Sequence, residues 1–137
     1  MIPEPGKALA ELAGKLALGV LPEVGSTYGM ANAGLISLLM GALAEDFERA
    51  IANRFADVAE LRDLFAQASA APGATERAEF AASEPASLAL ADVCAWHDEG
   101  MALLIELHPW AEQTDTAVDS EIWQFLYRHT ERNRFAD

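Results

Sequence analysis

The chain of 137 residues contains a single cysteine, Cys94. One cysteine excludes an intrachain disulfide and a cysteine-rich zinc site formed within one chain. The first five residues, Met1 to Pro5, include an acid and two prolines where a signal peptide would carry basic residues. Together these features predict a protein of the reducing cytoplasm.

Basic residues are also scarce, since nine Lys and Arg face 22 Asp and Glu and the formal net charge is −13. Such an acidic surface repels nucleic acid and anionic lipid, so neither is expected as a partner. Residues 78–127 contain ten acids and no Lys or Arg. This segment is either a solvated face that favours solubility or a docking surface for a basic partner. The chain's own Arg128, Arg132 and Arg134 are candidates for that basic partner.

β-branched residues are few, whereas Ala, Leu and Glu are plentiful, a mixture that favours helices over strands. Hydrophobic residues make up 52% of the chain, enough for a core and for some surface covered by a second chain. The length predicts one domain, residues 1–137.

The longest uncharged run covers residues 25–44, which is long enough to cross a membrane as a helix. Polar residues interrupt it, among them Ser26, Thr27 and Asn32, and both flanks are acidic. Membrane spans are usually flanked by Lys and Arg. The run therefore predicts a buried central helix, and no membrane partner is expected.

Apolar periodicity predicts a first helix over residues 6–20 and a second that begins at a Ser26 or Thr27 cap. The expected buried face of the first helix comprises Leu9, Leu12, Leu16 and Val20. The expected buried stripe of the second comprises Asn32, Ile36, Leu39, Met40, Leu43, Phe47 and Ile51. The opposite face carries the small residues Gly34, Ser37 and Gly41, which favour close packing against a helix of this chain or of a second copy.

Four later segments are also predicted to be helical. Asp57 followed by Glu60 resembles a capping box and predicts a helix start. A short helix is expected over residues 75–82, a long one from Pro85 to a position before Pro109, and a last one from about 119 to 134. The set predicts an all-α protein, an antiparallel bundle of four main helices with one or two short extra helices.

His97 and His108 are the best candidates for chemistry, because they lie 11 residues apart on one apolar helix face. A ligand pocket would use His97 with Asn32, Met101, His108 and Trp110, but structural roles are favoured for both histidines. Three helical turns separate the two imidazoles by about 16 Å, too far to share one metal ion. Cys94 and His97 alone are too few ligands for zinc. No metal and no cofactor is expected.

Catalytic motifs are missing. The residues three positions before the histidines are Cys94, Ile105 and Leu126, so the Glu-x-x-His pairs of a di-iron bundle are absent. There is no Gly-x-Ser-x-Gly nucleophile elbow and no glycine-rich phosphate loop followed by lysine. An enzyme is therefore less favoured than a protein without catalytic activity.

The segment from Val20-Leu21-Pro22 through Tyr28, Ala31-Asn32-Ala33 and Ile36 resembles the start of a family of small helical bacterial proteins of unknown function. Members of that family tend to be encoded near acyl-CoA dehydrogenases and small-molecule phosphotransferases. The resemblance covers about 30 residues and carries no catalytic residues to this chain. It implies an all-α accessory protein.

Two hypotheses on function follow from the sequence. The first is a non-enzymatic helical bundle that homodimerises and acts as an interaction or accessory protein. The second is a small-molecule-binding protein, or a simple enzyme, with an apolar interhelical pocket around His97. Membrane attachment through residues 25–44 is a third and less favoured hypothesis.

Overall fold

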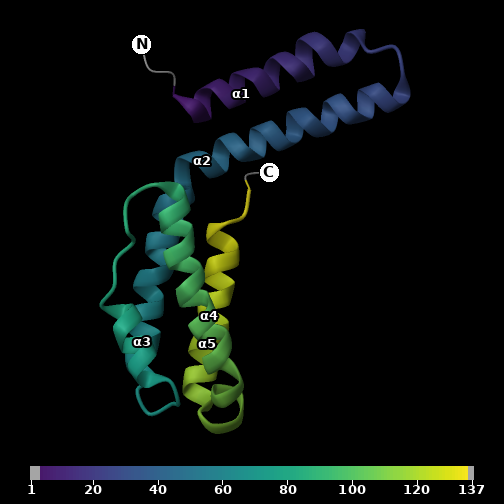
Figure 1. Ribbon diagram of the computed structural model, residues 1–137. Coiled ribbons are helices and arrows are strands. Elements are labelled where there is room, and N and C mark those ends of the chain that lie inside the picture. The colour runs from purple at the N-terminus through teal and green to yellow at the C-terminus, as the bar shows by residue number, and fades with distance from the viewer. Residues whose placement is uncertain (1–3, 136–137) are drawn as a thin grey trace. The chain divides into compact units, whose positions relative to one another are not determined.

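A computed structural model describes residues 4–135, and within that range every regular element is helical (Figure 1). The all-α prediction is therefore confirmed. The five α-helices are α1 (Pro5–Lys15), α2 (Thr27–Gln67), α3 (Ala74–Ala81), α4 (Leu90–Thr114) and α5 (Thr116–Arg132). A π-helical turn (Leu16–Val20) and a 3-10 turn (Leu21–Glu23) follow α1. The chain divides into two compact units, one up to Ala50 and one from Ile51 to Arg134, and α2 contributes to both.

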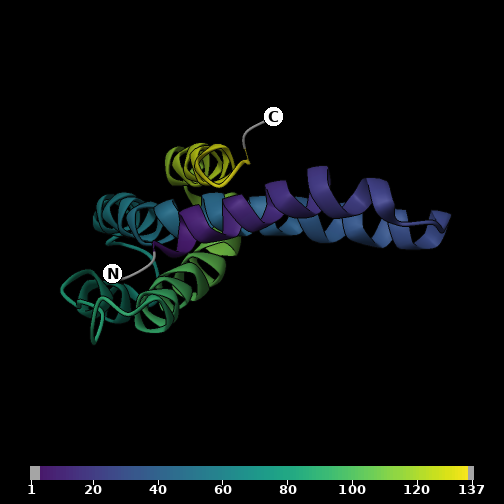
Figure 2. The same ribbon diagram turned by 90° about the horizontal axis from the view of Figure 1, so that it is seen from above.

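The first unit is a helical hairpin in which α1 runs back along the N-terminal half of α2 (Figures 1 and 2). Pro22 lies in the 3-10 turn between the two arms. The Ser26 hydroxyl then accepts a hydrogen bond from the Gly29 backbone N–H at 3.0 Å, which caps α2 as one of the two predicted caps. Ser37 Oγ donates to the Ala13 carbonyl at 2.9 Å, which joins the arms.

The arms of the hairpin pack through small residues rather than through the predicted leucines. Gly6 and Ala13 are the buried residues of α1, and a Cβ at Gly6 would collide with the Glu48 side chain. Leu12 and Val20, expected to be buried, are exposed. On α2 the half-buried face carries Gly34, Ser37 and Gly41. This face lies toward α1 of the same chain, where Ser37 bonds to Ala13, but nothing lies within 4 Å of a Cβ added at Gly34 or Gly41, so the predicted close packing at the two glycines is not found.

The predicted buried stripe of α2 is wrong, because most of it faces outward. Small residues allow two helices to approach closely, and this turns the longer side chains away from the contact. Of that stripe, Met40 alone is half-buried, and the exposed members are Asn32, Ile36, Leu39, Leu43, Phe47 and Ile51.

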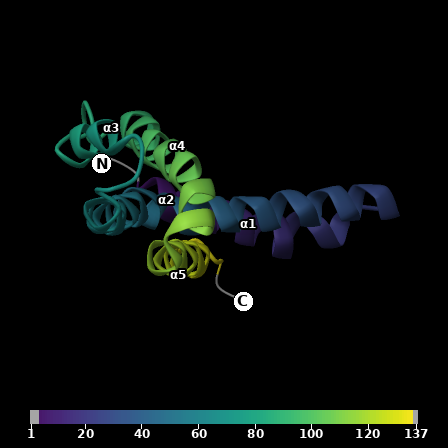
Figure 3. The same ribbon diagram turned by 90° about the horizontal axis from the view of Figure 1, so that it is seen from below.

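The second unit has a continuous apolar core between the C-terminal half of α2 and helices α3, α4 and α5. Figure 3 shows the C-terminal half of α2 and helix α5 nearly end-on, with α4 inclined to both. The ring of Phe80 of α3 packs against two others, with its centroid 6.0 Å from that of Phe65 of α2 and 6.1 Å from that of Trp96 of α4. The most deeply buried large residues are Phe125, Leu61, Leu107, Ile122, Val58 and Val93.

Helix α2 continues through Asp57, where a new helix was predicted to begin. Asp57 is 1% exposed, so its carboxylate serves the interior instead of capping a helix. The helix ends before a turn at Gly73, which has a φ of 77°. The buried Arg77 donates to the carbonyl oxygens of Ala68 and Pro72 at 3.0 and 2.6 Å, and so satisfies acceptors that the end of α2 leaves free.

The predicted bounds of the last two helices also need correction. α4 begins at Leu90 rather than at Pro85 and passes through Pro109 to Thr114. Pro109 and Ile105, whose carbonyl loses its helical donor, both lie on the exposed side of α4, so that carbonyl is accessible to solvent. α5 begins four residues earlier than the predicted cap at 119, because the Asp115 carboxylate accepts from the N–H groups of Ala117 and Val118.

Candidate functional sites

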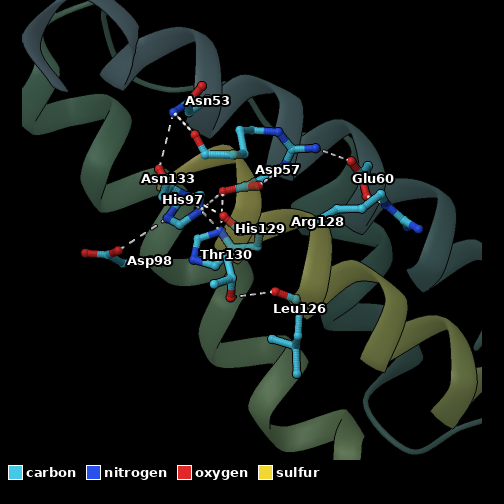
Figure 4. Close-up of polar contacts among 11 residues, drawn as sticks. Asn53, Asp57, Glu60, His97, Asp98, Leu126, Arg128, His129, Thr130 and Asn133 are labelled. Atoms are coloured by element: carbon cyan, nitrogen blue, oxygen red, sulfur yellow. Dashed lines mark hydrogen bonds and ion pairs between the residues drawn. The ribbon is translucent and has the colours of Figure 1, made fainter. Parts of the chain in front are cut away.

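The most prominent polar feature of the second unit is a buried cluster centred on the carboxylate of Asp57 (Figure 4). Three helices supply it, with Asp57 on α2, His97 on α4 and His129 on α5. Asp57 shares one face of α2 with Val58, Leu61 and other core residues, so folding of the core carries the carboxylate inside. We call this set, together with Glu60, Arg128 and Arg132, the Asp57 cluster.

One carboxylate oxygen of Asp57 accepts hydrogen bonds from both imidazoles. Its Oδ2 lies 2.9 Å from His97 Nε2 and 2.7 Å from His129 Nδ1, while Oδ1 accepts from Arg132 Nη1. A carboxylate only accepts, so both ring nitrogens carry protons in this arrangement. The two imidazole rings are stacked, with centroids 5.9 Å apart. Asp57 thereby ties α4 and α5 to α2.

A second carboxylate balances the charge of the cluster. Glu60 accepts hydrogen bonds from Arg132 Nη2 and, at 2.7 Å, from Arg128 Nε. Two carboxylates and two guanidinium groups sum to zero when both imidazoles are neutral. Two of the three C-terminal arginines therefore pair with acids of α2, not with the acidic segment 78–127.

Hydrogen bonds with the charged groups govern the ionisation of Asp57. Burial alone raises the pKa of a carboxyl, because it removes water from the charged form. Here the hydrogen bonds from His97 and His129, with the charges of His129 and Arg132, outweigh burial and lower the pKa of Asp57 below its ordinary value. The carboxylate is thus held in its charged form.

The ligand atoms of Asp57, His97 and His129 lie within 4.8 Å of one another, close enough to be considered as a metal site. An ion there would have to replace two hydrogen bonds on the same oxygen and sit beside the Arg132 guanidinium. Both changes oppose binding of a cation. The donor set fits an ion-pair network better than a metal centre.

A second group of ligand atoms joins the C-terminal part of α4 to the start of α5. His108 Nε2 lies 3.2 Å from Asp119 Oδ1 and 3.8 Å from Glu112 Oε1, and all three ligand atoms lie within 4.8 Å of one another. The His108 ring also meets Trp123 edge to face, with centroids 5.4 Å apart. We call this the His108 group.

The third feature is the exposed apolar surface of the hairpin. Eleven large hydrophobic residues between positions 12 and 47 are exposed, against six between positions 51 and 134. The hairpin also contains the membrane-span candidate within α2, a window of which only 11% is buried. The eleven are Leu12, Leu18, Val20, Tyr28, Met30, Leu35, Ile36, Leu38, Leu39, Leu43 and Phe47.

The residues predicted from sequence to form a ligand pocket are distributed over separate features. His97 belongs to the Asp57 cluster and His108 to the group with Asp119. Met101 and Trp110 are half-buried and pack against the core of the second unit. Asn32 lies exposed in the hairpin, and the hydrogen-bond partner of His97 Nε2 is Asp57 instead.

Asp57, His129, Glu112 and Asp119 were not predicted as site residues. The signal for Asp57 was present, since an acid directly before Val58 and four residues before Leu61 falls on an apolar helical face. The capping-box pattern with Glu60 predicted a helix start at Asp57 instead of a buried site residue. No local pattern singles out His129, because its partner Asp57 lies 72 residues earlier in the chain.

Comparison with protein-family models, with curated proteins and with solved structures found no match to this chain.

Proposed function

We propose that this protein is a non-enzymatic interaction or accessory protein of the cytoplasm that homodimerises through its N-terminal hairpin. The observation that carries the proposal is the concentration of exposed large hydrophobic residues between positions 12 and 47. Large hydrophobic residues that are exposed in number on one part of a protein, rather than singly, favour a site of association. The function lies in assembly, with the second unit as a stable helical body.

Burial of this surface supplies the driving force. Full burial of a Leu, Ile or Phe side chain stabilises by about 1.5–3 kcal/mol relative to full exposure. Leu18 is 84% and Leu38 69% exposed, so each still has most of that free energy to gain. Several such side chains on both arms are enough to offset the entropy lost when two chains associate.

A lipid bilayer fits the hairpin less well than protein does. The hydrogen bond between Ser37 and Ala13 fixes how the arms align, and Lys15 lies two residues beyond Ala13. Lys15 therefore lies beside the middle of the uncharged run 25–44, and Glu11 lies close to it along α1. Insertion of that run would place both exposed charges deep in hydrocarbon, at a cost of about 3 kcal/mol for each charged side chain.

A second copy of the chain is the partner that best fits this surface. The same apolar face is available on both copies, as a two-fold symmetric interface requires. Asp46 and Glu48 add negative charge at the open end of the hairpin, beside the Glu45–Arg49 ion pair, so two hairpins repel if these ends meet. An antiparallel arrangement separates the acids, and two hairpins of two arms each then form a four-helix antiparallel bundle.

The alternative function, a small-molecule pocket around His97, has less support. The His97 ring is buried, and both ring nitrogens have carboxylate neighbours, Asp57 at 2.9 Å and Asp98 at 3.5 Å. The ring is also stacked on His129. A ligand would have to displace these contacts before it reached a free polar atom.

The proposal is tested with a charge placed on the hairpin. Leu38→Glu puts a carboxylate into the proposed interface and is expected to convert a dimer into a monomer, as measured by sedimentation velocity. Ile105→Glu is the matched control, because Ile105 of α4 is 70% exposed and Leu38 is 69% exposed. The control is expected to stay dimeric. If Leu38→Glu sediments as the control does, the hairpin is not the interface.

A further inference from the structure

We propose that His108, Glu112 and Asp119 form a binding site for a divalent transition-metal ion, with Zn²⁺ as the best-fitting ion. The site offers one imidazole nitrogen and two carboxylate oxygens from two helices. It is separate from the surface proposed for dimerisation, since all three residues belong to the second unit. The ion would join α4 to α5 near the turn that connects them.

Local structure brings the three ligands together. His108 and Glu112 are four residues apart on α4, a spacing that places both side chains on one face of the helix. The Asp115 cap starts α5 early, so Asp119 lies in its first turn and faces back toward His108. Helix α4 passes through Pro109, and without that continuation Glu112 would not share a helical face with His108.

The distances suit a metal ion after small side-chain movements. Nitrogen and oxygen ligands bind Zn²⁺ at about 2.0–2.2 Å, so neighbouring ligands of a tetrahedral ion lie about 3.3–3.6 Å apart. His108 Nε2 is 3.2 Å from Asp119 Oδ1 and 3.8 Å from Glu112 Oε1. The side chains of His108 and Asp119 are 22% and 25% exposed, which holds them in place, while that of Glu112 is 55% exposed and free to adjust.

The His108 group differs from the Asp57 cluster in its local charge. Asp57 already has the guanidinium of Arg132 as its counter-charge. The two carboxylates of the His108 group lie within a segment, residues 78–127, that contains no Lys or Arg. Two acids that share one imidazole gain more from a cation than carboxylates that already have guanidinium partners.

The donor set indicates the class of ion. Imidazole with carboxylates suits Zn²⁺ and related first-row ions, whereas Mg²⁺ and Ca²⁺ favour oxygen ligands alone. Three protein ligands leave at least one coordination position for water. Because the ion binds the folded pair of helices, it is expected to raise the thermal stability of the protein.

The test is a calorimetric titration of Zn²⁺ into the full-length chain after treatment with a chelator. One ion per chain is expected to bind. Glu112→Gln and His108→Ala are each expected to weaken binding at least about tenfold, because loss of an outer partner of a metal ligand already costs 10–100-fold. Melting temperature measured with and without Zn²⁺ gives a second readout, and far-UV circular dichroism checks that each variant folds.

Glu106→Gln is the matched control, since Glu106 is an exposed acid on the same helix and is expected to bind Zn²⁺ as the wild type does. The proposal is overturned if the wild type binds no Zn²⁺ in the titration. It is equally overturned if Glu112→Gln, as well folded as the control, binds Zn²⁺ with the affinity of the wild type.

Discussion

At the scale of single residues, Asp57 determines how the second unit is held together. It is 1% exposed, yet it carries a charge that His97, His129 and Arg132 stabilise from two other helices. A buried charge that keeps all its partners is tolerated, whereas one that loses a partner is costly. Asp57 therefore holds its three partners in position, and they in turn stabilise its charge.

Replacement of the carboxylate tests this role. Asp57→Asn removes the charge that Arg132 pairs with and places an amide against two imidazole donors, so we expect a loss of about 3–5 kcal/mol in the free energy of unfolding. Urea denaturation measures the change. Asp63→Asn, an exposed acid six residues further along α2, is the control and is expected to change stability by less than about 0.5 kcal/mol. Equal stability of the two variants would contradict the structural role of Asp57.

The lowered pKa of Asp57 also predicts how stability depends on pH. A carboxyl whose pKa is lower in the folded than in the unfolded chain contributes stability above its unfolded pKa of about 3.9. That contribution is lost as the pH falls through the folded pKa. The difference in unfolding free energy between the wild type and Asp57→Asn is therefore expected to shrink below about pH 4. Urea denaturation at neutral pH and at pH values below 4 measures it, and a constant difference would show that Asp57 does not titrate in this way.

At the scale of helices, close approaches are confined to a few positions. A Cβ at Gly100 of α4 would come within 2.5 Å of the Phe80 ring and 3.1 Å of Leu61, both deeply buried. At Gly34 and Gly41, which the sequence singled out, an added Cβ meets nothing within 4 Å. Close packing in the second unit therefore requires glycine at position 100, whereas Gly34 and Gly41 leave room for a methyl group.

This contrast predicts that alanine at the two positions changes the free energy of unfolding in opposite directions. Gly100→Ala gains about 1 kcal/mol in helix propensity but overpacks the core, and we expect a net loss of about 1–2 kcal/mol in unfolding free energy. Gly34→Ala is the matched change in open space and is expected to stabilise by up to about 1 kcal/mol. Thermal unfolding at one fixed protein concentration compares the two. Stabilisation of both variants would mean that Phe80 and Leu61 yield easily.

Local sequence signals predicted that the helices exist better than they predicted where each helix begins and ends or which face is buried. A short helix was predicted over residues 75–82, and α3 (Ala74–Ala81) lies there with Phe80 buried. The helix bounds predicted at Asp57, Pro85 and Pro109 were wrong. Asp57 is buried within α2, α4 begins only at Leu90, and α4 continues through Pro109 on its exposed side. The buried face of the hairpin was also wrong, because periodicity identifies an apolar face but not what covers it.

The candidate sites were less predictable than the helices. His97 was selected from its place on an apolar face, and it is buried there. Its partner Asp57 is 40 residues away in the chain, and His129 is 72 residues from Asp57. Spacing along one helix cannot indicate such pairs. Glu112 and His108 share a helical face, but Asp119 joins them because α5 starts at Asp115.

At the scale of the whole molecule, apolar and charged groups are divided between the two units. The hairpin carries most of the exposed large hydrophobic residues, whereas the second unit holds the buried ion-pair network and the continuous core. A net charge of −13 keeps chains apart over most of their surface. This division favours the proposed association through the uncharged part of the hairpin, where repulsion is smallest.

The most direct test of the central claim is the mass of the untagged wild-type protein in plain buffer, measured by sedimentation equilibrium over micromolar concentrations. A homodimer predicts a mass of twice the 14.7 kDa chain, reached without detergent. A well-folded species of 14.7 kDa at high micromolar concentration would contradict dimerisation through the hairpin. A protein that stays in solution only with detergent would instead assign residues 25–44 to a membrane.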